Sequence, residues 1–443
     1  MKYLWLFMLI LFLFSGNAIS QTMDSVEIGS IYGQVVESQA KEIHPDEVIN
    51  KKQISLKDAL IITLLKNPQL LAYSLQVRSM DAEVLQASFL PNPELDVELE
   101  NFAGQNEVSG FKSTETTIQL GQLLELGGKR GKRTKVAKIG VLGSKADYEA
   151  VKLMIFAEVT DAFVRVLTAQ EQLKLQKELV SLAENFVVSI QKRVEAGKVS
   201  PAELARAKVS LARTRLEFGR MQNELHIARK NLVRLWGMTQ VPFDSVTGEL
   251  GQLITLPDLQ DIESEVEAHP MIVSQMFRIK QNEAIYELEK SRRIPNVNIS
   301  FGVRRMNESG NQALVASISM PVMIFNRNQG MIERAKIQKD IATVEYKRAI
   351  LDMKTKIYQM YQSIKWLQKE IKNYQTGIIP SAEMSFRIIT KGYEVGRFTS
   401  LDVLDAQRTL FEVKSEYLNR LAEYQIILGN LESITGRPLN SLK

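Results

Sequence analysis

The chain has 443 residues, a formal net charge of +5, 45% hydrophobic residues and no cysteine. The lack of cysteine excludes a disulfide framework and a thiolate metal site. Basic and acidic residues are interspersed and no nucleic-acid-binding signature is present, so we expect no nucleic-acid partner.

Residues 1–20 have the pattern of a secretory signal peptide. Lys2 supplies a positive start, residues 4–14 are apolar, and Ala18-Ile19-Ser20 offers a cleavage site. The apolar run of about eleven residues is shorter than the roughly 20 that a membrane-spanning helix needs, which argues against the alternative of a retained anchor. Residues 21–54 lack periodicity and predict an extended N-terminal arm, with disorder as the alternative.

The two halves of the chain repeat each other. Residues 200–237 carry an unbroken heptad pattern that recurs about 199 residues downstream. The other shared landmarks are Asn67-Pro68 with His269-Pro270, Leu90-Pro91-Asn92 with Ile294-Pro295-Asn296, and residues 195–200 with residues 394–399. We therefore expect two structural repeats, 55–240 and 259–437, with a linker at 241–258 and a tail at 438–443.

Each repeat should contain an opening helix, a strand pair and a long helical hairpin. Prolines are absent between Lys129 and Arg193, which predicts a helix on the order of 100 Å long. Pro380 should kink or interrupt its counterpart in the second repeat. The expected opening helices are 56–89 and 259–291, the strand pairs 92–124 and 295–323, and the hairpins 128–238 and 328–435.

The strand pairs alternate between apolar and polar residues. Leu95, Val97 and Leu99 alternate with acidic residues, and the other three strands follow the same period. Strands of about ten residues with one apolar face suit a bilayer crossing. Four strands cannot close a barrel, but three chains would supply twelve. The alternative is a soluble four-stranded sheet covered by helices.

The two hairpin turns carry a family resemblance. Arg193-Val-Glu-Ala-Gly-Lys-Val-Ser-Pro-Ala-Glu-Leu204 and Gly392-Tyr-Glu-Val-Gly-Arg-Phe-Thr-Ser-Leu-Asp-Val-Leu-Asp-Ala406 resemble the tips of TolC-like outer-membrane efflux proteins. The resemblance implies a mainly α-helical protein with a membrane β-barrel. It implies a homotrimer with a twelve-stranded barrel in outer-membrane lipid and a helical tunnel in the periplasm. It also implies a passive exit duct that works with a periplasmic adaptor and an inner-membrane pump.

Two further motifs indicate which branch of this family the chain resembles. Pro91-Asn-Pro-Glu-Leu95 and Gln122-Leu-Leu-Glu-Leu-Gly-Gly-Lys-Arg130 are similar to the branch that serves cobalt-zinc-cadmium or copper pumps of the resistance-nodulation-division (RND) class. Heavy-metal cations are the substrates that this branch implies, with drug efflux or type I secretion as alternatives. Many relatives carry a lipid-modified cysteine at the mature N-terminus, which this chain lacks.

Asp402 and Asp405 match the paired aspartates that line the periplasmic constriction in this family. In a trimer they would form two rings of three carboxylates, which would attract cations. The alternative is a pair of solvated carboxylates near a helix start. The corresponding positions of the first repeat, Glu203 and Arg206, retain one acid and lose the other.

The hairpin tips are the expected docking sites for an adaptor. Gly197 and Gly396 should adopt positive φ in the turns. Ser200 and Thr399 should cap the returning helices, with Glu203 completing a capping box in the first repeat. Val199 and Phe398 are expected to be exposed there and to contact the adaptor.

The remaining motifs suggest no chemistry. The turn at residues 127–133 resembles a phosphate-binding loop but lacks its first glycine and its Ser or Thr, so we interpret it as a basic turn at the periplasmic rim, near anionic lipid or the equatorial region. His44, His226 and His269 are scattered. We therefore predict no metal site, no cofactor and no enzymatic activity. The rival to the duct is a periplasmic adaptor or other coiled-coil protein without a pore.

Overall fold

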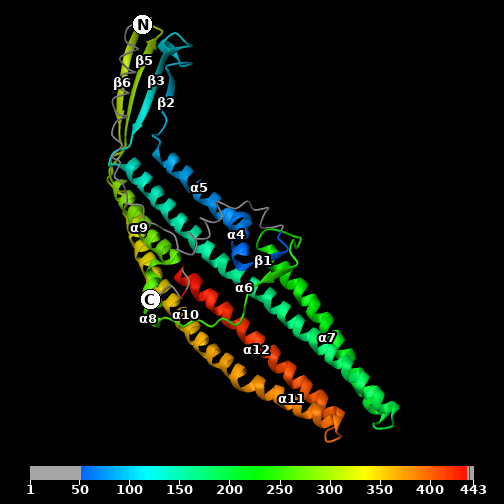
Figure 1. Ribbon diagram of the computed structural model, residues 1–443. Helices are drawn as coiled ribbons and strands as arrows, with labels where there is room; N and C mark the ends of the chain where they lie inside the picture. Colours follow the sequence, from blue (N-terminus) through cyan, green and yellow to red (C-terminus); the bar gives the residue numbers. More distant parts are fainter. Residues whose placement is uncertain (1–50, 437–438, 440–443) are drawn as a thin grey trace.

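The computed structural model of the chain describes residues 51–436 and Leu439. The expected signal peptide at 1–20, residues 21–50 of the expected arm and the rest of the expected tail lie outside the described residues. The molecule is elongated, with a β-sheet at one end and helical turns at the other (Figure 1). Within the described part, no helix is both long enough and apolar enough to cross a bilayer.

Both repeats follow the same plan of opening helices, a strand pair and a long helical hairpin. The first comprises β1 (Gln53–Ser55), α4 (Leu56–Lys66), α5 (Pro68–Ser88), β2 (Glu94–Glu100), the short 3₁₀ helix η1 (Asn106–Val108), β3 (Glu115–Leu124), α6 (Lys129–Glu195) and α7 (Pro201–Arg234). The linker contains β4 (Ser245–Thr247). The second comprises α8 (Leu259–Ser264), the 3₁₀ helix η2 (Glu265–Ala268), α9 (Pro270–Ser291), β5 (Val297–Met306), β6 (Gln312–Ser319), α10 (Gln329–Asn373), the π-helical turn η3 (Tyr374–Ile378), α11 (Ile379–Glu394) and α12 (Ser400–Thr435).

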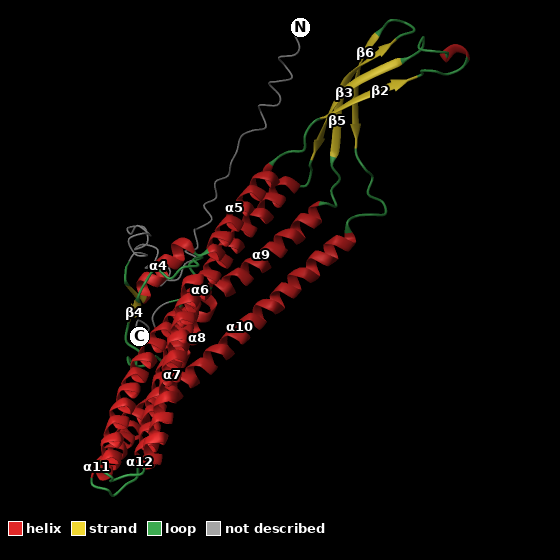
Figure 2. Ribbon diagram, turned by 90° about the vertical axis from the view of Figure 1, so that its right-hand side faces the viewer, coloured by secondary structure: helices red, strands yellow, loops and turns green. Residues whose placement is uncertain are grey.

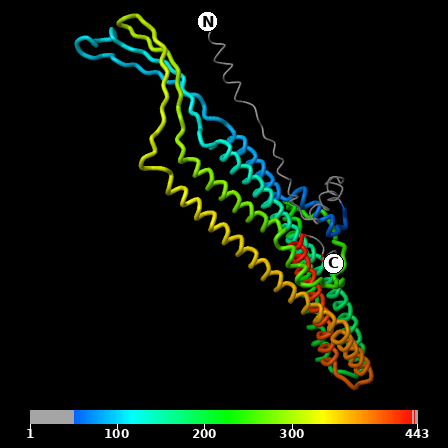
Figure 3. The backbone as a smooth tube through the Cα atoms, turned by 90° about the vertical axis from the view of Figure 1, so that its left-hand side faces the viewer, coloured from blue at the N-terminus to red at the C-terminus, as the bar shows by residue number. Residues whose placement is uncertain are grey.

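Two long hairpins form the body of the molecule (Figures 2 and 3). Hairpin 1 consists of α6 and α7, and hairpin 2 of α10, η3, α11 and α12. Helix α6 runs without interruption for 67 residues, or about 100 Å at 1.5 Å per residue. In hairpin 2 the outgoing helix changes to a π-helical turn directly before Pro380. The interruption predicted at Pro380 is therefore confirmed.

The opening helices are broken rather than continuous. Asn67 ends α4 and caps α5, because its Oδ1 accepts hydrogen bonds from the backbone N–H groups of Gln69 (2.9 Å) and Leu70 (3.0 Å). His269 caps α9 in the same way, with its Nδ1 accepting from Met271 N at 3.2 Å. The parallel pairing of β1 with β4 was not predicted. Pairing between three-residue strands so far apart in sequence leaves no periodic signal.

The two strand pairs join into one antiparallel sheet in the order β2-β3-β5-β6. One row across the sheet joins Val97, Ile118, Val303 and Leu314, and all four side chains are exposed on the same face. The opposite face carries most of the polar residues of each strand, as the alternation predicted. Within the described residues, β2 and β6 are edge strands with one neighbour each.

The main hydrophobic core lies at mid-height, where both hairpins meet. Trp236 and Tyr424, each at most 1% exposed, are among its largest buried side chains. A second cluster joins α6 to α9 around Phe277. A third, which we call the tip cluster, contains Ile190, Ala207, Tyr393 and Val403 and joins the ends of the two hairpins.

Candidate functional site at the hairpin tips

Asp402 lies in the first turn of α12 and belongs to a capping box with Thr399. The backbone N–H of Thr399 donates to Asp402 Oδ2 (2.7 Å), and the N–H of Asp402 donates to Thr399 Oγ1 (3.3 Å). The backbone hydrogen bond from Thr399, together with its hydroxyl, holds the pKa of Asp402 below its usual value. This carboxylate therefore stays negatively charged at neutral and mildly acidic pH.

Asp405 lies one helical turn further along α12 and is more exposed. Its side chain is 67% exposed and lies 3.3 Å from the guanidinium of Arg408. It lines a groove of about 500 Å³ between α12 and hairpin 1, together with Arg213 and Gln407. The Gln407 side chain is buried there. The structure thus brings both predicted aspartates to one end of α12, with different local partners.

The predicted glycine turns are confirmed at both tips. Gly197 has φ of 70° and Gly396 of 79°, in the left-handed region that glycine adopts without strain. After each glycine the next N–H closes the helix end: Lys198 N donates to Arg193 O (2.8 Å) and Arg397 N to Gly392 O (2.8 Å). These are the 6→1 bonds of a Schellman motif, which makes both tips tight.

The capping box predicted in the first repeat is wrong. Ser200 caps α7 through a hydrogen bond from Ala202 N at 3.2 Å. Glu203, however, does not return its carboxylate to the cap, because Oε2 is buried near the Tyr393 ring. The capping box is instead in the second repeat, where the shorter Asp402 reaches Thr399.

The predicted exposure of the two apolar tip residues is confirmed for Phe398 and wrong for Val199. Val199 is half-buried against the tip cluster. Phe398 is 39% exposed, and its ring lies so close to Gly392 that a Cβ there would clash with it. Val395 and Leu401, at 71% and 59% exposure, are the more accessible apolar side chains.

A contact between the two tips was not predicted. The guanidinium of Arg193 lies over the Tyr393 ring, 4.4 Å from its centroid, and Nη1 donates to Tyr393 O at 2.9 Å. Phe186 packs on the same ring with a centroid distance of 5.5 Å. Burial raises the pKa of the Tyr393 hydroxyl, an effect that Arg193 opposes. Arg193 and Tyr393 lie 200 positions apart, so only their membership of the two tip motifs could have pointed to this contact.

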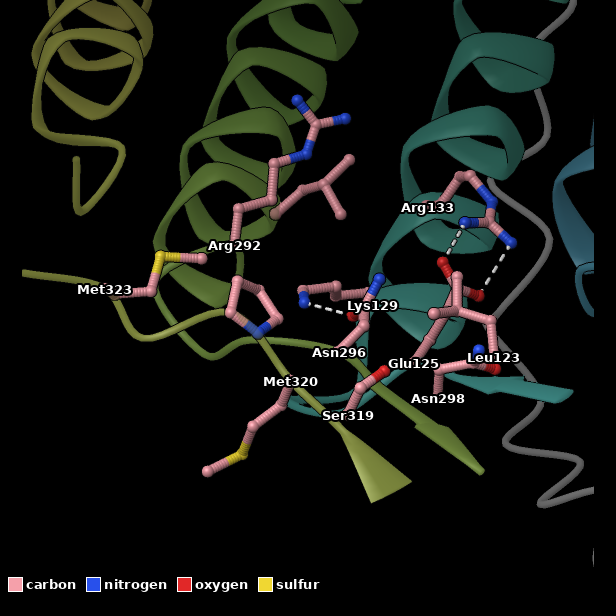
Figure 4. A pocket seen from close by; sticks show the side chains of 12 residues that line it. Leu123, Glu125, Lys129, Arg133, Arg292, Asn296, Asn298, Ser319, Met320 and Met323 are labelled. Carbon is pink, nitrogen blue, oxygen red and sulfur yellow. Dashed lines mark hydrogen bonds and ion pairs between the residues drawn. The ribbon is translucent and has the colours of Figure 1, made fainter. Parts of the chain in front are cut away.

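The basic turn lies at the junction between sheet and helices, beside a cavity of about 760 Å³ (Figure 4). Lys129, which is 8% exposed, donates through Nζ to Ile294 O (2.5 Å) and to Asn296 Oδ1. Arg133 binds Glu125 at 2.7 Å and donates to the Ala87 carbonyl at 3.1 Å. The turn joins strand to helix as predicted, and these two side chains connect it to neighbouring segments of the junction.

The described residues contain no group of three or more His, Cys, Asp or Glu side chains that could hold a metal ion. The His269 ring is buried and acts as a helix cap.

Comparison with known proteins agrees with this architecture. The family described as "Outer membrane efflux protein" matches residues 61–238 and 262–437, one match in each repeat. The chain is 31% identical over 385 residues to the cobalt-zinc-cadmium resistance protein CzcC of Cupriavidus metallidurans, covering 87% of this chain and 90% of that protein. It is 25% identical over 268 residues to the nickel and cobalt resistance protein CnrC of the same organism, covering 60% and 63%.

Solved structures share the fold. The crystal structure of CusC superposes with a TM-score of 0.74 at 18% identity, covering 86% of this chain and 92% of that chain. The CmeC outer membrane channel of Campylobacter jejuni gives 0.72 at 16% identity, covering 86% and 85%. With two family matches that follow the internal duplication and a relative of 31% identity along most of its length, this chain belongs to the outer membrane efflux protein family, whose members are outer-membrane channels and not enzymes.

Proposed function

We propose that three copies of this chain form the exit duct of a tripartite efflux system, which passively releases heavy-metal cations across the outer membrane. The observation that carries the proposal is the four-stranded sheet with two open edges. Strands β2 and β6 run antiparallel to each other and each has an unpaired side. An exposed edge is a template for pairing with another chain.

Pairing β6 of one copy with β2 of the next repeats the same contact around a ring. Such a head-to-tail contact gives a closed ring only if equal rotations between neighbouring copies add up to a full turn. Two copies would give eight strands, a barrel that side chains fill, whereas three give twelve and leave a channel. The exposed apolar row through Val97 and Leu314 would face lipid, and the polar face would line the lumen.

The helices carry a matching unpartnered surface. Exposed apolar residues recur at helical spacing along α10, and they are Ile337, Ile341, Val344, Leu351 and Tyr358, with exposures of 43–66%. A stripe of exposed apolar residues along one helix suits packing against a partner helix. A second copy would cover it and extend the barrel into a helical tunnel.

Cations are the substrates that the lumen favours. The polar face of β2 carries four carboxylates, those of Glu94, Asp96, Glu98 and Glu100. The cation paired on this face is Arg304, which lies 3.2 Å from Glu100 and 3.0 Å from Glu115. The remaining carboxylates would give the lumen a negative potential that concentrates cations. CzcC is a cobalt-zinc-cadmium resistance protein, and CnrC is a nickel and cobalt resistance protein. Both relatives therefore also favour metal cations as the substrates.

The tip half of the duct has two proposed roles. Asp402 and Asp405 would form the periplasmic constriction, where rings of carboxylates attract cations and disfavour anions. The tips themselves, Gly197 to Ser200 and Gly396 to Thr399, would dock a periplasmic adaptor that connects the duct to an inner-membrane RND pump. Val395 and Leu401 are the apolar side chains that this docking would cover.

Gene deletion and reconstitution together test the proposal. A strain without the gene should become sensitive to zinc, cobalt, cadmium or nickel, and the purified protein should run as a trimer and conduct ions in planar bilayers. Unchanged metal tolerance with altered tolerance to antibiotics or detergents would favour a drug-efflux duct. A monomer that stays in the periplasmic fraction would refute the duct altogether.

A further inference from the structure

Exposed apolar side chains continue past the ends of the strands, where the sheet meets the helices. The apolar face of β3, which contains Ile118 and Leu120, extends to Leu124 at the end of the strand. Further apolar side chains follow on the connecting loops with exposures of 41–89%, and they are Leu126, Ile294, Val322, Ile324 and Phe325. We call Leu124 and these five residues the apolar rim. The rim ends where the helices begin, because α6 starts at Lys129 and α9 ends at Ser291.

The start of α6, directly beyond the apolar rim, is basic. Residues 129–138 contain no Asp or Glu, and the Lys and Arg residues among them are Lys129, Arg130, Lys132, Arg133, Lys135 and Lys138. The positive end of the helix dipole lies at a helix start, where cations are destabilising and carboxylates are preferred. A sequence that places this many cations at an unfavourable position indicates that they have another function.

Some of these cations have structural partners and others do not. Lys129 and Arg133 bind groups of the junction, as described above. In the part of the chain that the structure describes, Lys135 and Lys138 are exposed and form no salt bridge. Their ammonium groups are therefore available to a ligand.

One carboxylate lies among the exposed cations. Glu287 of α9 binds Lys290 at 2.9 Å, and Lys132 Nζ donates to the Glu287 backbone carbonyl at 3.1 Å. The hydrogen bond from Lys290 lowers the pKa of Glu287, and the charges of Lys132 and Lys135 add to this shift. We call Lys132, Lys135, Lys138 and Lys290 the basic patch. Its four positive charges exceed the one negative charge of Glu287, so the patch keeps an excess of positive charge.

The basic patch and the junction cavity lie on different sides of the helices. Asn298 and Ser319, which line the cavity, belong to the polar face of the sheet, so the cavity opens toward the lumen of the proposed barrel. Arg292 of α9 also lines the cavity (Figure 4). Lys290 lies two residues earlier, about 200° around the helix. The patch therefore lies on the side of α9 that faces away from the lumen.

A trimer would leave this side uncovered. Helix α6 packs between α5 and α9, and α9 packs between α6 and α10. The edge helices α5 and α10 would meet the neighbouring copies, whereas α6 and α9 lie in the middle of each copy's wall. The basic patch would remain exposed on the outside of the duct, next to the apolar rim.

The patch has the depth of a lipid headgroup layer. Lys132 and Lys138 lie six residues apart, or about 9 Å along α6. The headgroup region adds roughly 5–8 Å to each side of the hydrocarbon core, and the long lysine stems extend the reach of the charges. An apolar band followed by cations is the arrangement by which proteins contact an anionic membrane surface.

We propose that the basic patch binds the anionic headgroups of phospholipids in the periplasmic leaflet of the outer membrane, while the apolar rim contacts their acyl chains. Charge complementarity selects anionic over zwitterionic lipids, because each cation near the surface attracts them. Three copies would place three such patches around the duct. The inference rests on the proposed barrel, since insertion of the sheet is what brings the patch to the headgroups.

Lipid-specific fluorescence quenching tests the proposal. The chain has no cysteine, so Leu126→Cys carries a single bimane label on the apolar rim. The labelled protein is reconstituted in phosphatidylcholine vesicles with a small fraction of phosphatidylglycerol, and bromine on the acyl chains of one lipid or the other quenches the label. Phosphatidylglycerol should be enriched around the label at least about fivefold over its bulk fraction, the effect of one cation near an anionic surface.

Salt should weaken this enrichment. Raising the ionic strength from about 0.1 M to about 1 M shortens the Debye length from about 10 Å to about 3 Å. Enrichment that persists unchanged at the higher ionic strength would contradict an electrostatic patch.

Charge variants identify the residues. The neutral variant of the patch should lose most of the enrichment, and it combines Lys135→Gln, Lys138→Gln and Lys290→Gln. Arginine at the same three positions keeps the charge and should retain the enrichment. The matched control removes the same charge from exposed positions of hairpin 1 and should leave the enrichment unchanged; it combines Lys177→Gln, Lys208→Gln and Lys230→Gln.

The outcomes separate the patch from the barrel and the duct. Equal quenching by both brominated lipids would overturn the patch alone and would favour a protein partner as its occupant. Inorganic phosphate that removes the enrichment at matched ionic strength would show a site for free phosphate and would also overturn the proposal. A label that neither lipid quenches would lie outside a bilayer, which would refute the barrel together with the patch. The metal sensitivity of the deletion strain decides the export function independently.

Discussion

The start of α9, which His269 caps, should lose stability at acidic pH, whereas the equivalent start of α5 in the first repeat should not. The replacement His269→Asn should remove this difference. His269 caps α9 only while its Nδ1 is unprotonated, since that atom accepts the Met271 N–H. Burial lowers its pKa from 6.5 to about 4; a hydrogen bond with the Ser433 backbone opposes this shift, and the charge of Lys356 adds to it. Protonation would destroy the cap and place a positive charge at a helix N-terminus.

The direction of the pH effect follows from the lowered pKa. Between pH 6.5 and 4 the unfolded chain binds a proton that the folded chain excludes, so stability falls as the pH falls through this window. The full shift corresponds to roughly 3 kcal/mol, and the loss at pH 5 to about 2 kcal/mol, or roughly thirtyfold in local opening. Above pH 7 the stabilisation is fully present.

Asn67 shows why asparagine is the matched replacement. Its Oδ1 caps α5, and its Nδ2 donates to Leu235 O at 2.7 Å, near the end of the return helix. At the equivalent position of the second repeat, His269 caps the start of α9 and makes a hydrogen bond with the backbone of Ser433 in α12. Hydrogen exchange of the first-turn amides of α9 should therefore show wild type and His269→Asn alike at pH 7.5, with wild type opening more at pH 5. The same pH dependence in both proteins would refute this account.

The other predictions concern the tips and the junction. Neutralising the proposed constriction with Asp402→Asn and Asp405→Asn should reduce cation selectivity, measured as the reversal potential in asymmetric KCl; an unchanged potential would place the constriction elsewhere. Arg193→Ala should remove the stacking on Tyr393 and one hydrogen bond, weakening the tip contact by about 1–3 kcal/mol, and should raise mean conductance, with Arg193→Lys intermediate. Lys129→Met should lower the temperature at which trimers dissociate on heated gels, because it removes a buried donor worth about 1–3 kcal/mol; an unaltered temperature would show that the junction does not depend on it.

Periodic features of the fold could be predicted from the sequence. The heptads of α7 and α12 and the alternation in β2, β3, β5 and β6 report which face of each element is buried or shared, because packing imposes a period on the residues. The pairing between β3 and β5, in contrast, could not be predicted from a periodic pattern. It connects strands about 180 residues apart, and no local pattern encodes it.

Local polar geometry was less predictable than periodicity. Ser200 with Glu203 has the usual spacing of a capping box, but Oε2 of Glu203 is buried and the carboxylate does not return to the cap. Thr399 with Asp402 has the same spacing and forms the box. Sequence can locate a helix start in both cases, but only the packing around a side chain decides which hydrogen bond it makes.

Asp402 shows that a structural role and a pore role are compatible. Its Oδ2 accepts two hydrogen bonds from Thr399, which lower its pKa and fix its position at the start of α12. A carboxylate that must face two others across a threefold axis would otherwise tend to take up a proton. The capping box opposes that tendency and preserves the charge. In the proposed trimer, the two interpretations of this residue drawn from the sequence, helix cap and constriction, would therefore describe one arrangement in which the cap keeps the ring ionised.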